Sequence, residues 1–324
     1  MNRREAIIGG AAAVAGAGLL ARRASAETRL TIMVFPGMPN LPLFAAQQNG
    51  FFAKRDLAVD IKYAPNSDVQ RAGLADGHFQ LVHTAADNAV AMAEMAKVDV
   101  AIIIGGDDSF NHLFVTPDIK SYADIKGKTV LVDAPNTAYA FQLYAMLKQH
   151  GLNKNDYVVK SVGGTTARVK GMQDGTGVAG MINPPFSITG AREGLKDMGS
   201  AAEALGAYQA GSAVVLRSWA QQNQDTLVHY LQAYLEGLRW SLDRKNKDAA
   251  VKLYVEKLHL PADVAAQCYD IVSAPKGGLA VDGAFDMEGF KNVLKLRTEF
   301  EGGPPLAPEK YVDLSYYRKA LAAM

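Results

Sequence analysis

Cysteine is almost absent from this chain of 324 residues, because Cys268 is its only example. A single cysteine excludes an intramolecular disulfide, a Cys-x-x-Cys redox site and a cysteine-based structural zinc site. An excess of either charge is also absent, since 34 Lys and Arg residues stand against 33 Asp and Glu residues. This balance argues against a nucleic-acid-binding protein, which normally carries a basic excess.

Several motifs that mark catalytic or metal sites are missing as well. The sequence has no Gly-x-Ser-x-Gly elbow, no His-Glu-x-x-His motif and no Walker motif. The six histidines do not form the close pairs that metal sites favour. With 49% hydrophobic and 21% charged residues, the composition is that of a globular protein. We therefore expect a folded protein without a metal or another cofactor, and the sequence gives little support for catalysis.

Residues 1–26 have the pattern of an export signal. Arg3 and Arg4 precede a mildly apolar run over residues 6–21, and small residues at Ala24 and Ala26 suit a signal peptidase. The run is shorter than the roughly 20 residues that span a bilayer as a helix, so we expect cleavage rather than anchoring. The adjacent arginines favour the twin-arginine (Tat) route over the general (Sec) route, whereas Ala6 stands where a bulkier residue is more usual. The prediction is a periplasmic protein.

After residue 27, short apolar runs alternate with helical patterns. Strands are expected at residues 30–35, 59–63, 79–84, 98–104, 128–132, 158–162 and 178–182. Helices lie between them, one of them opened by a capping-box pattern at Ser67 and Gln70. From residue 218 onward the chain is mostly helical, with further helices starting at Asn246, at Pro261, near Asp286 and near Ala307. This order predicts an α/β fold with mostly parallel sheets covered by helices on both faces.

In such folds ligands bind beyond the carboxyl ends of the strands, where loops turn into helix N-termini. The residues that follow the strands are therefore the candidate ligand-binding residues: Pro39, Asn40, Leu41, Thr84, Asp87, Asn88, Asn136, Thr137, Tyr139, Gly164, Thr165, Asn183 and Phe186. Plain helix capping is the alternative for the groups around Asp87 and Thr137, and a structural turn is the alternative for Gly164 and Asn183. We expect Asp107 and Asp108 to cap a turn or face solvent, and His83 to have a buried or surface role.

Three segments carry a resemblance to a known family. They are LPLFAAQQNGFFAKRDLAVDIKY at residues 41–63, AGLADGHFQLVHTAADN at residues 72–88 and ADIKGKTVLVDAPNTAYAF at residues 123–141. They resemble periplasmic solute-binding proteins of the nitrate/sulfonate/taurine and thiamine-pyrimidine-precursor family, and the resemblance covers residues 28–245. It implies the type II periplasmic binding fold, which has two α/β lobes joined by two crossing strands. Lobe 1 would comprise residues 28–113 plus 215–324, and lobe 2 residues 114–214.

The resemblance also implies a function. The protein would be the substrate-binding subunit of an ABC importer, a non-enzymatic monomer that closes on a solute and delivers it to a membrane permease with a separate ATPase. The candidate loops contain neither Lys nor Arg, which disfavours a multiply charged anion because a buried charge needs a partner. A small organic solute remains, whether aromatic, heterocyclic or mono-anionic. A periplasmic sensor subunit and an enzyme on the same fold are the alternatives.

Overall fold

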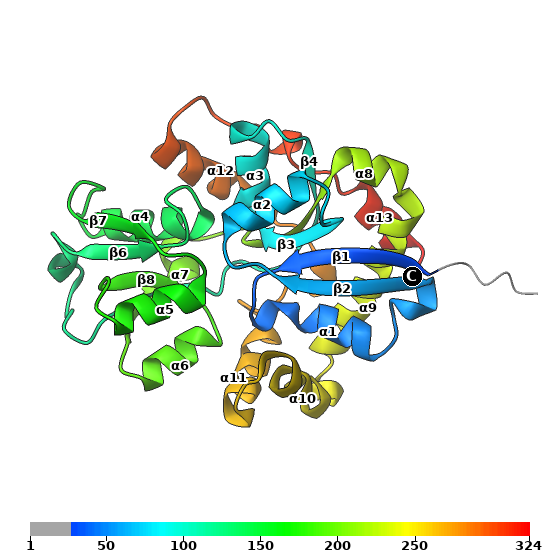
Figure 1. Ribbon diagram of the computed structural model, residues 1–324, viewed down its shortest axis with the longest axis horizontal. Coiled ribbons are helices and arrows are strands. Elements are labelled where there is room, and N and C mark those ends of the chain that lie inside the picture. The colour runs from blue at the N-terminus through cyan, green and yellow to red at the C-terminus, as the bar shows by residue number, and fades with distance from the viewer. Residues whose placement is uncertain (1–26) are drawn as a thin grey trace, which may run out of the picture.

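The computed structural model describes residues 27–324, so the predicted signal at residues 1–26 lies outside the described residues. Two separate five-stranded sheets organise the chain (Figure 1). No helix within residues 27–324 combines the length and the apolar character needed to cross a membrane. The α/β architecture with two sheets agrees with the prediction.

The first sheet has the strand order β2-β1-β3-β10-β4. Its strands are β1 (Thr28–Val34), β2 (Leu57–Tyr63), β3 (Leu81–Ala85), β4 (Val100–Gly105) and β10 (Gly211–Leu216). β1 pairs in parallel with β2 and with β3, whereas β10 runs antiparallel to both of its neighbours, β3 and β4. The sheet is therefore mixed, with one reversed strand among otherwise parallel ones.

The second sheet repeats this plan with the order β7-β6-β8-β5-β9. Its strands are β5 (His112–Val115), β6 (Thr129–Val132), β7 (Val158–Ser161), β8 (Ala179–Ile182) and β9 (Lys196–Ser200). Here β5 is the reversed strand, antiparallel to β8 and β9. Because β5 follows β4 in the chain but belongs to the other sheet, and β10 belongs again to the first, the chain crosses between the sheets twice.

Helices cover both faces of each sheet. The first sheet is covered by α1 (Leu41–Gln48), α2 (Ser67–Ala75), α3 (Ala86–Met95), α8 (Arg217–Gln222), α9 (Gln224–Leu242), α12 (Met287–Glu301) and α13 (Ser315–Ala322). Two further helices, α10 (Lys247–Leu258) and α11 (Ala262–Val272), pack on each other and outside α1. The second is covered by α4 (Ala138–Gln149), α5 (Thr165–Gln173), α6 (Phe186–Arg192) and α7 (Ala201–Leu205). Short 3-10 turns are η1 (Met38–Asn40), η2 (Ala53–Arg55), η3 (Tyr122–Ile125), η4 (Arg244–Asn246), η5 (Val281–Gly283) and η6 (Pro308–Lys310).

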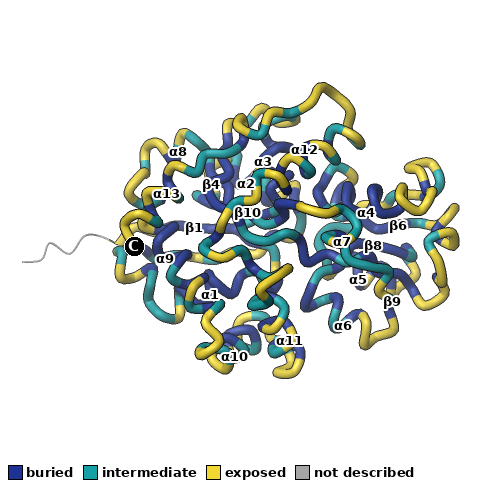
Figure 2. The backbone as a smooth tube through the Cα atoms, turned by 180° about the vertical axis from the view of Figure 1, so that it is seen from behind, coloured by how far each residue is buried: buried dark blue, intermediate teal, exposed yellow. Residues whose placement is uncertain are grey.

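Successive side chains of a strand point to opposite faces of its sheet, so each sheet has one hydrophobic core on each face. Ile32 of β1 packs into the core that contains α1 and α9, whereas Met33 packs into the core that contains α3 and α12. In the second sheet, Val130 belongs to the core with α4 and Leu131 to the core with α5. As Figure 2 shows, the inner strands are mostly buried, whereas the outer helices and the edge strands β2, β7 and β9 carry exposed or half-buried residues.

Three elements that follow β8 escaped the sequence prediction: α6, β9 and α7. β9 has the sequence KDMGS and α7 has only five residues, so neither shows a hydrophobic period. The helix expected near Ala307 is also wrong, because only the turn η6 forms there and the helix α13 begins at Ser315. Edge strands and single turns draw their stability from neighbouring elements rather than from their own pattern.

The two segments that cross between the sheets pack backbone against backbone. A Cβ atom added at Gly106 would lie 2.9 Å from the carbonyl carbon of Gly211. A Cβ atom added at Gly211 would lie 3.2 Å from the backbone nitrogen of Asp107 and would displace the Asp107 carboxylate. Glycine is required at this crossing because any side chain would push the two segments apart.

Candidate functional site

Two adjoining cavities lie where the carboxyl ends of the two sheets face each other. We name them the Asp107 cavity and the Arg168 cavity, each after one charged residue of its lining. The Asp107 cavity is lined by Phe35, Pro36, Gly37, Pro39, Asn40, His83, Thr84, Ala85, Gly105, Gly106, Asp107, Ser109, Phe110, Asn111, Tyr139, Asn183, Ala210, Gly211, Ser212, Tyr234 and Leu279. The Arg168 cavity is lined by Phe35, Pro36, Ala64, Pro65, Ser67, Ala85, Asn88, Asp133, Thr137, Ala138, Tyr139, Gly164, Thr165, Thr166, Ala167, Arg168, Lys170, Asn183 and Phe186.

The two cavities form one cleft. Phe35, Tyr139 and Asn183 are among the residues that line both of them. With their open mouths included, the volumes are about 770 Å³ for the Asp107 cavity and about 1060 Å³ for the Arg168 cavity. Spaces of this size suit small molecules. Residues from both sheets contribute to the lining, so a bound solute would contact both lobes at once.

Most of the residues expected to bind a ligand line this cleft. Pro39, Asn40 and Thr84 lie in the Asp107 cavity, Tyr139 and Asn183 lie in both cavities, and Asn88, Thr137, Gly164, Thr165 and Phe186 lie in the Arg168 cavity. They come together because they follow the carboxyl ends of strands in both sheets. Their contact with a ligand stays a prediction.

Asp87 does not line the cleft, although its helix begins there. Its side chain is fully buried and accepts two hydrogen bonds from Nη1 of Arg297, at 2.8 Å to Oδ1 and 2.9 Å to Oδ2. The Arg297 side chain is 3% exposed. The structure therefore does not bring the Asp87 carboxylate into the cleft, because Arg297 of α12 already pairs with its charge.

Leu41 and Asn136 are also placed away from the cleft. Leu41 is fully buried at the start of α1 and packs into the core of the first lobe. Asn136 turns towards α3, where its Nδ2 lies 3.4 Å from Sδ of Met95, and its carbonyl oxygen accepts a bond from Arg297. Their neighbours in sequence, Asn40 and Thr137, which were also predicted, do line the cleft.

The capping box predicted at Ser67 is replaced by a different arrangement. Asn66 is the N-cap of α2, and its side chain accepts the backbone N–H of Val69 at 2.9 Å. The hydroxyl of Ser67 is thereby released to donate to Oδ2 of Asp133, at 2.5 Å, on the opposite side of the cleft. Ser67 thus links the lobes instead of capping its own helix.

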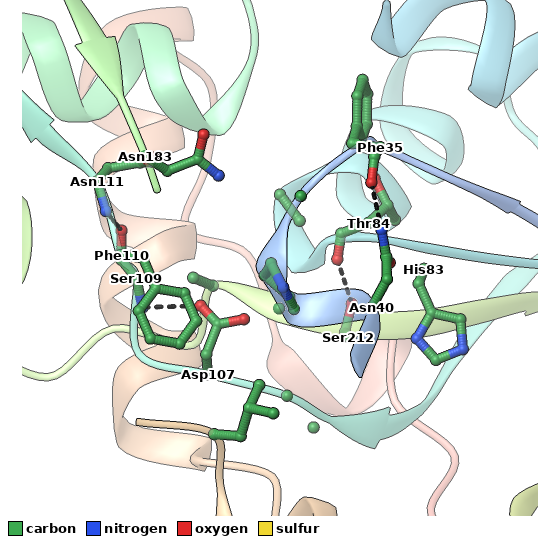
Figure 3. A pocket seen from close by; sticks show the side chains of 18 of the residues that line it. Phe35, Asn40, His83, Thr84, Asp107, Ser109, Phe110, Asn111, Asn183 and Ser212 are labelled. Carbon is green, nitrogen blue, oxygen red and sulfur yellow. Dashed lines mark hydrogen bonds between the residues drawn. The ribbon is translucent and has the colours of Figure 1, made fainter. Parts of the chain in front are cut away.

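Asp107 brings a carboxylate into the first cavity without a cation beside it (Figure 3). Its Oδ1 accepts the backbone N–H of Ser109 at 3.0 Å. Among residues 27–324, no Lys, Arg or His nitrogen lies within 4.0 Å of it. Burial, with a smaller contribution from the charge of Asp108, raises the pKa of Asp107 to about 6. The group is still mainly ionised at pH 7.

His83 and Tyr139 supply neutral polar groups to the same cavity. Nε2 of His83 lies 2.7 Å from the hydroxyl of Tyr230, and burial lowers the pKa of His83 to about 4. Burial raises the pKa of Tyr139 to about 12, so its hydroxyl stays protonated. Nδ2 of Asn183 lies 3.4 Å from that hydroxyl. These groups can exchange hydrogen bonds with a solute without changing their charge at neutral pH.

Arg168 dominates the second cavity and was missed by the sequence analysis. It is 1% exposed and donates to the carbonyl oxygens of Gly163 and Met181 and to the hydroxyl of Thr165. The guanidinium carbon lies 5.2 Å from the ring centre of Tyr139. Burial lowers the pKa of Arg168. Arginine nevertheless remains charged in proteins.

Arg168 corrects the inference that the site holds no cation. That inference considered only the loops that follow the strands, whereas Arg168 lies one turn inside α5. Side chains on the first turn of a helix can also reach a cleft at its N-terminus. Asp107 was visible after a strand but was assigned to capping or solvent, and His83 to a buried or surface role, so both also belong to the site that the sequence analysis missed.

Comparisons with solved structures agree with this architecture. The periplasmic nitrate-binding protein of Synechocystis PCC 6803 matches with a TM-score of 0.76 and 12% identity, over 92% of this chain and 89% of that one. The periplasmic aliphatic sulphonate-binding protein of Escherichia coli matches with a TM-score of 0.70 and 17% identity, over 90% and 99%. A desulfurization enzyme matches with a TM-score of 0.62 and 14% identity, over 91% and 99%. At these identities the likeness shows the fold alone, and binding proteins and an enzyme share it.

The sequence comparisons identify the family. No sequence among the curated proteins matches this chain. The profile of the family described as NMT1/THI5-like, in contrast, matches residues 39–247, which is well over half of the chain. This region contains the three segments on which the resemblance was based. The chain therefore belongs to the NMT1/THI5-like family and has the two-lobed fold of periplasmic solute-binding proteins.

Proposed function

We propose that this protein is the solute-binding subunit of an ABC importer, which captures a small organic solute by closing its two lobes. The observation that carries the proposal is the cleft itself, whose polar lining comes from both sheets while only two close-packed segments cross between them. A ligand that contacts both lobes stabilises the closed arrangement over the open one. The closed form would then be recognised by a membrane permease.

The rest of the expected biology follows from this role. Residues 1–26 would direct export to the periplasm, by the Tat route in preference to Sec. Residues 28–113 with 215–324 would move as one lobe against residues 114–214. The protein would act as a monomer without a cofactor, and a separate ATPase would supply the energy for uptake.

The experiment is a ligand search followed by a measurement of shape. Native mass spectrometry of the purified protein would detect a co-purified solute, and a thermal-shift screen would find solutes that raise the melting temperature. A binding solute should reduce the radius of gyration in small-angle X-ray scattering and leave the solute chemically unchanged. If solutes bind without compaction, the hinge mechanism is wrong.

An enzyme is the second candidate, because a desulfurization enzyme shares the fold. Cys268 lies on α11 and is fully buried in the core, so it lines neither cavity. Mass spectrometry of a solute incubated with the protein separates the two functions. Release of a product with turnover would replace the importer proposal by the enzyme.

Direct hydrogen bonds between the lobes lead to a prediction about closure. Besides the Ser67 hydroxyl, the Ser67 backbone N–H reaches Oδ2 of Asp133 at 3.3 Å, and the N–H of Gly164 donates to the carbonyl of Pro65 at 3.2 Å. A hydrogen bond to a charged group contributes about 1.5–3 kcal/mol. Ser67→Ala should therefore lower the ratio of closed to open molecules roughly tenfold. Double electron–electron resonance on spin labels attached at the exposed positions Asp60→Cys and Lys160→Cys should then show a larger share of long distances between the two labels.

The matched control is Ser161→Ala, at an exposed serine of β7 outside the cleft. It should leave the distance distribution of the labelled protein unchanged. The native Cys268 is buried, so labelling should be confined to the two introduced sites. Identical distance distributions for Ser67→Ala and the unsubstituted protein would show that this contact does not hold the lobes together.

A further inference from the structure

Helix α12 packs against the cores of both lobes, although its place in the chain assigns it to the first. Phe290, Val293 and Leu294 are buried in the core that α12 shares with α3. Leu296 is half-buried and contacts this core and also the core around α4 in the second lobe. Phe300 packs against the core around α4. The helix therefore reaches from one lobe to the other along its own length.

α12 is held to the first lobe by charge as well as by packing. Arg297 pairs with Asp87 of α3, and neither side chain is more than 3% exposed. Breaking a buried ion pair leaves an uncompensated charge and is strongly unfavourable. When the lobes move, α12 must therefore stay with α3 and the first lobe.

The C-terminal end of α12 contacts α4 of the second lobe through aromatic rings. The ring centre of Phe300 lies 6.1 Å from that of Phe141, with the ring planes 8° apart, and 5.5 Å from that of Tyr144, edge to face. Oε1 of Glu299 also accepts a hydrogen bond from Nζ of Lys148 at 2.6 Å. Both side chains of this ion pair are partly exposed, so it adds little, and the ring contacts carry most of the interaction.

The ring contact lies away from the place where the chain crosses between the lobes. Nδ2 of Asn292 donates to the carbonyl oxygen of Ala207, in the segment that joins α7 to β10, at 2.7 Å. Phe300 lies eight residues further along α12, which is about 12 Å at 1.5 Å per residue. A rotation of the lobes about the crossing segments therefore displaces α4 relative to Phe300.

Resting on the closing motion of the proposed function, we propose that the last turn of α12, with Glu299 and Phe300, is a latch for the closed arrangement. It holds α4 while Ser67 bonds to Asp133 across the cleft, and it releases α4 when the lobes open. The latch residues line neither cavity, so the latch sets the balance between open and closed molecules for every solute alike.

The test is Phe300→Ala in the mature chain with spin labels at Asp60→Cys and Lys160→Cys. Loss of the ring should raise the ratio of open to closed molecules roughly fivefold, measured by double electron–electron resonance as a larger share of long distances. In the Ser67→Ala background the two effects should multiply, because the two contacts share no residue. Phe300 is half-buried on the last turn of its helix, and a thermal melt shows whether the fold is retained.

The matched control is Phe51→Ala, because Phe51 is also half-buried but packs against the first-lobe core that contains α1 and α9. It should leave the distances between the labels unchanged. A second measurement fastens the latch instead of removing it. A short bis-maleimide that joins Lys148→Cys to Glu299→Cys should keep the radius of gyration at its closed value without any solute.

The outcomes separate the latch from the proposed function. If Phe300→Ala leaves the distances unchanged while Ser67→Ala lengthens them, the latch is overturned and the closing motion stands. A shift of Phe300→Ala towards shorter distances, or a cross-linked protein with the radius of gyration of the open form, also overturns the latch. Distances that no variant and no solute alter would overturn the closing motion itself, and the latch with it.

Discussion

Replacing Arg297 by methionine is expected to lower the free energy of unfolding by about 3–5 kcal/mol, because the change leaves a buried carboxylate without its cation. Asp87 is 0% exposed and Arg297 3% exposed in their side chains, and two hydrogen bonds of 2.8 and 2.9 Å join them. Methionine keeps most of the apolar volume, so the loss comes from charge rather than from a cavity. Urea unfolding followed by circular dichroism would measure it.

The controls separate a buried ion pair from a surface one. Arg192 pairs with Asp263 where both side chains are exposed, so Arg192→Met should change the free energy of unfolding by less than about 1 kcal/mol. The double variant Arg297→Met with Asp87→Leu should recover much of the lost stability, because no charge then remains buried. A loss under 1 kcal/mol for Arg297→Met alone would show that Asp87 is neutral or solvated.

Arg297 also connects α12 to the second lobe. Nη1 lies 3.4 Å from the carbonyl oxygen of Asn136, and the guanidinium carbon lies 5.4 Å from the ring centre of Phe141. The ring of Phe300, one turn further along α12, stacks on Phe141 with centroids 6.1 Å apart. α12 therefore packs on α3 and α4 together, at the top of the molecule in Figure 1.

The fold was predictable because its determinants are local. The alternation of Leu30, Ile32 and Val34 and the helical spacing of residues 227–242 identify strands and helices without knowledge of their partners. The order of these elements then restricts the topology to parallel sheets with helices on both faces. β9 was missed because its own residues show no strand pattern, and it is held as a strand by pairing with β5.

The sequence predicted where the site lies only to the extent that site residues follow the carboxyl ends of strands. That rule placed Asn40, Tyr139 and Asn183 near the cleft. It did not reveal that Asp87 is neutralised by Arg297, 210 residues later in the chain. It also gave no reason to weigh Arg168, which lies within a helix. Which polar side chain remains available to a ligand depends on distant partners, and a single sequence does not contain that information.

Asp107→Asn is expected to stabilise the free protein by up to about 3 kcal/mol at pH 7 and above, because it removes a carboxylate that burial disfavours. The pKa of Asp107 is raised from 3.8 to about 6 in the folded protein. Because the folded protein holds this proton more tightly than the unfolded chain does, its contribution to stability is complete below pH 3.8. That contribution is lost as the pH rises through 6, at about 1.4 kcal/mol per pH unit. The variant should therefore match the unsubstituted protein near pH 4 and exceed it increasingly up to pH 7.

Denaturant unfolding of both proteins at pH 4, 5, 6 and 7 would measure the difference. His83, whose pKa burial lowers to about 4, titrates in both proteins and cancels from the comparison. Asp108→Asn is the matched control, and it should give a smaller gain because Asp108 is less buried than Asp107. A constant difference across this pH range would mean that Asp107 is solvated in the free protein.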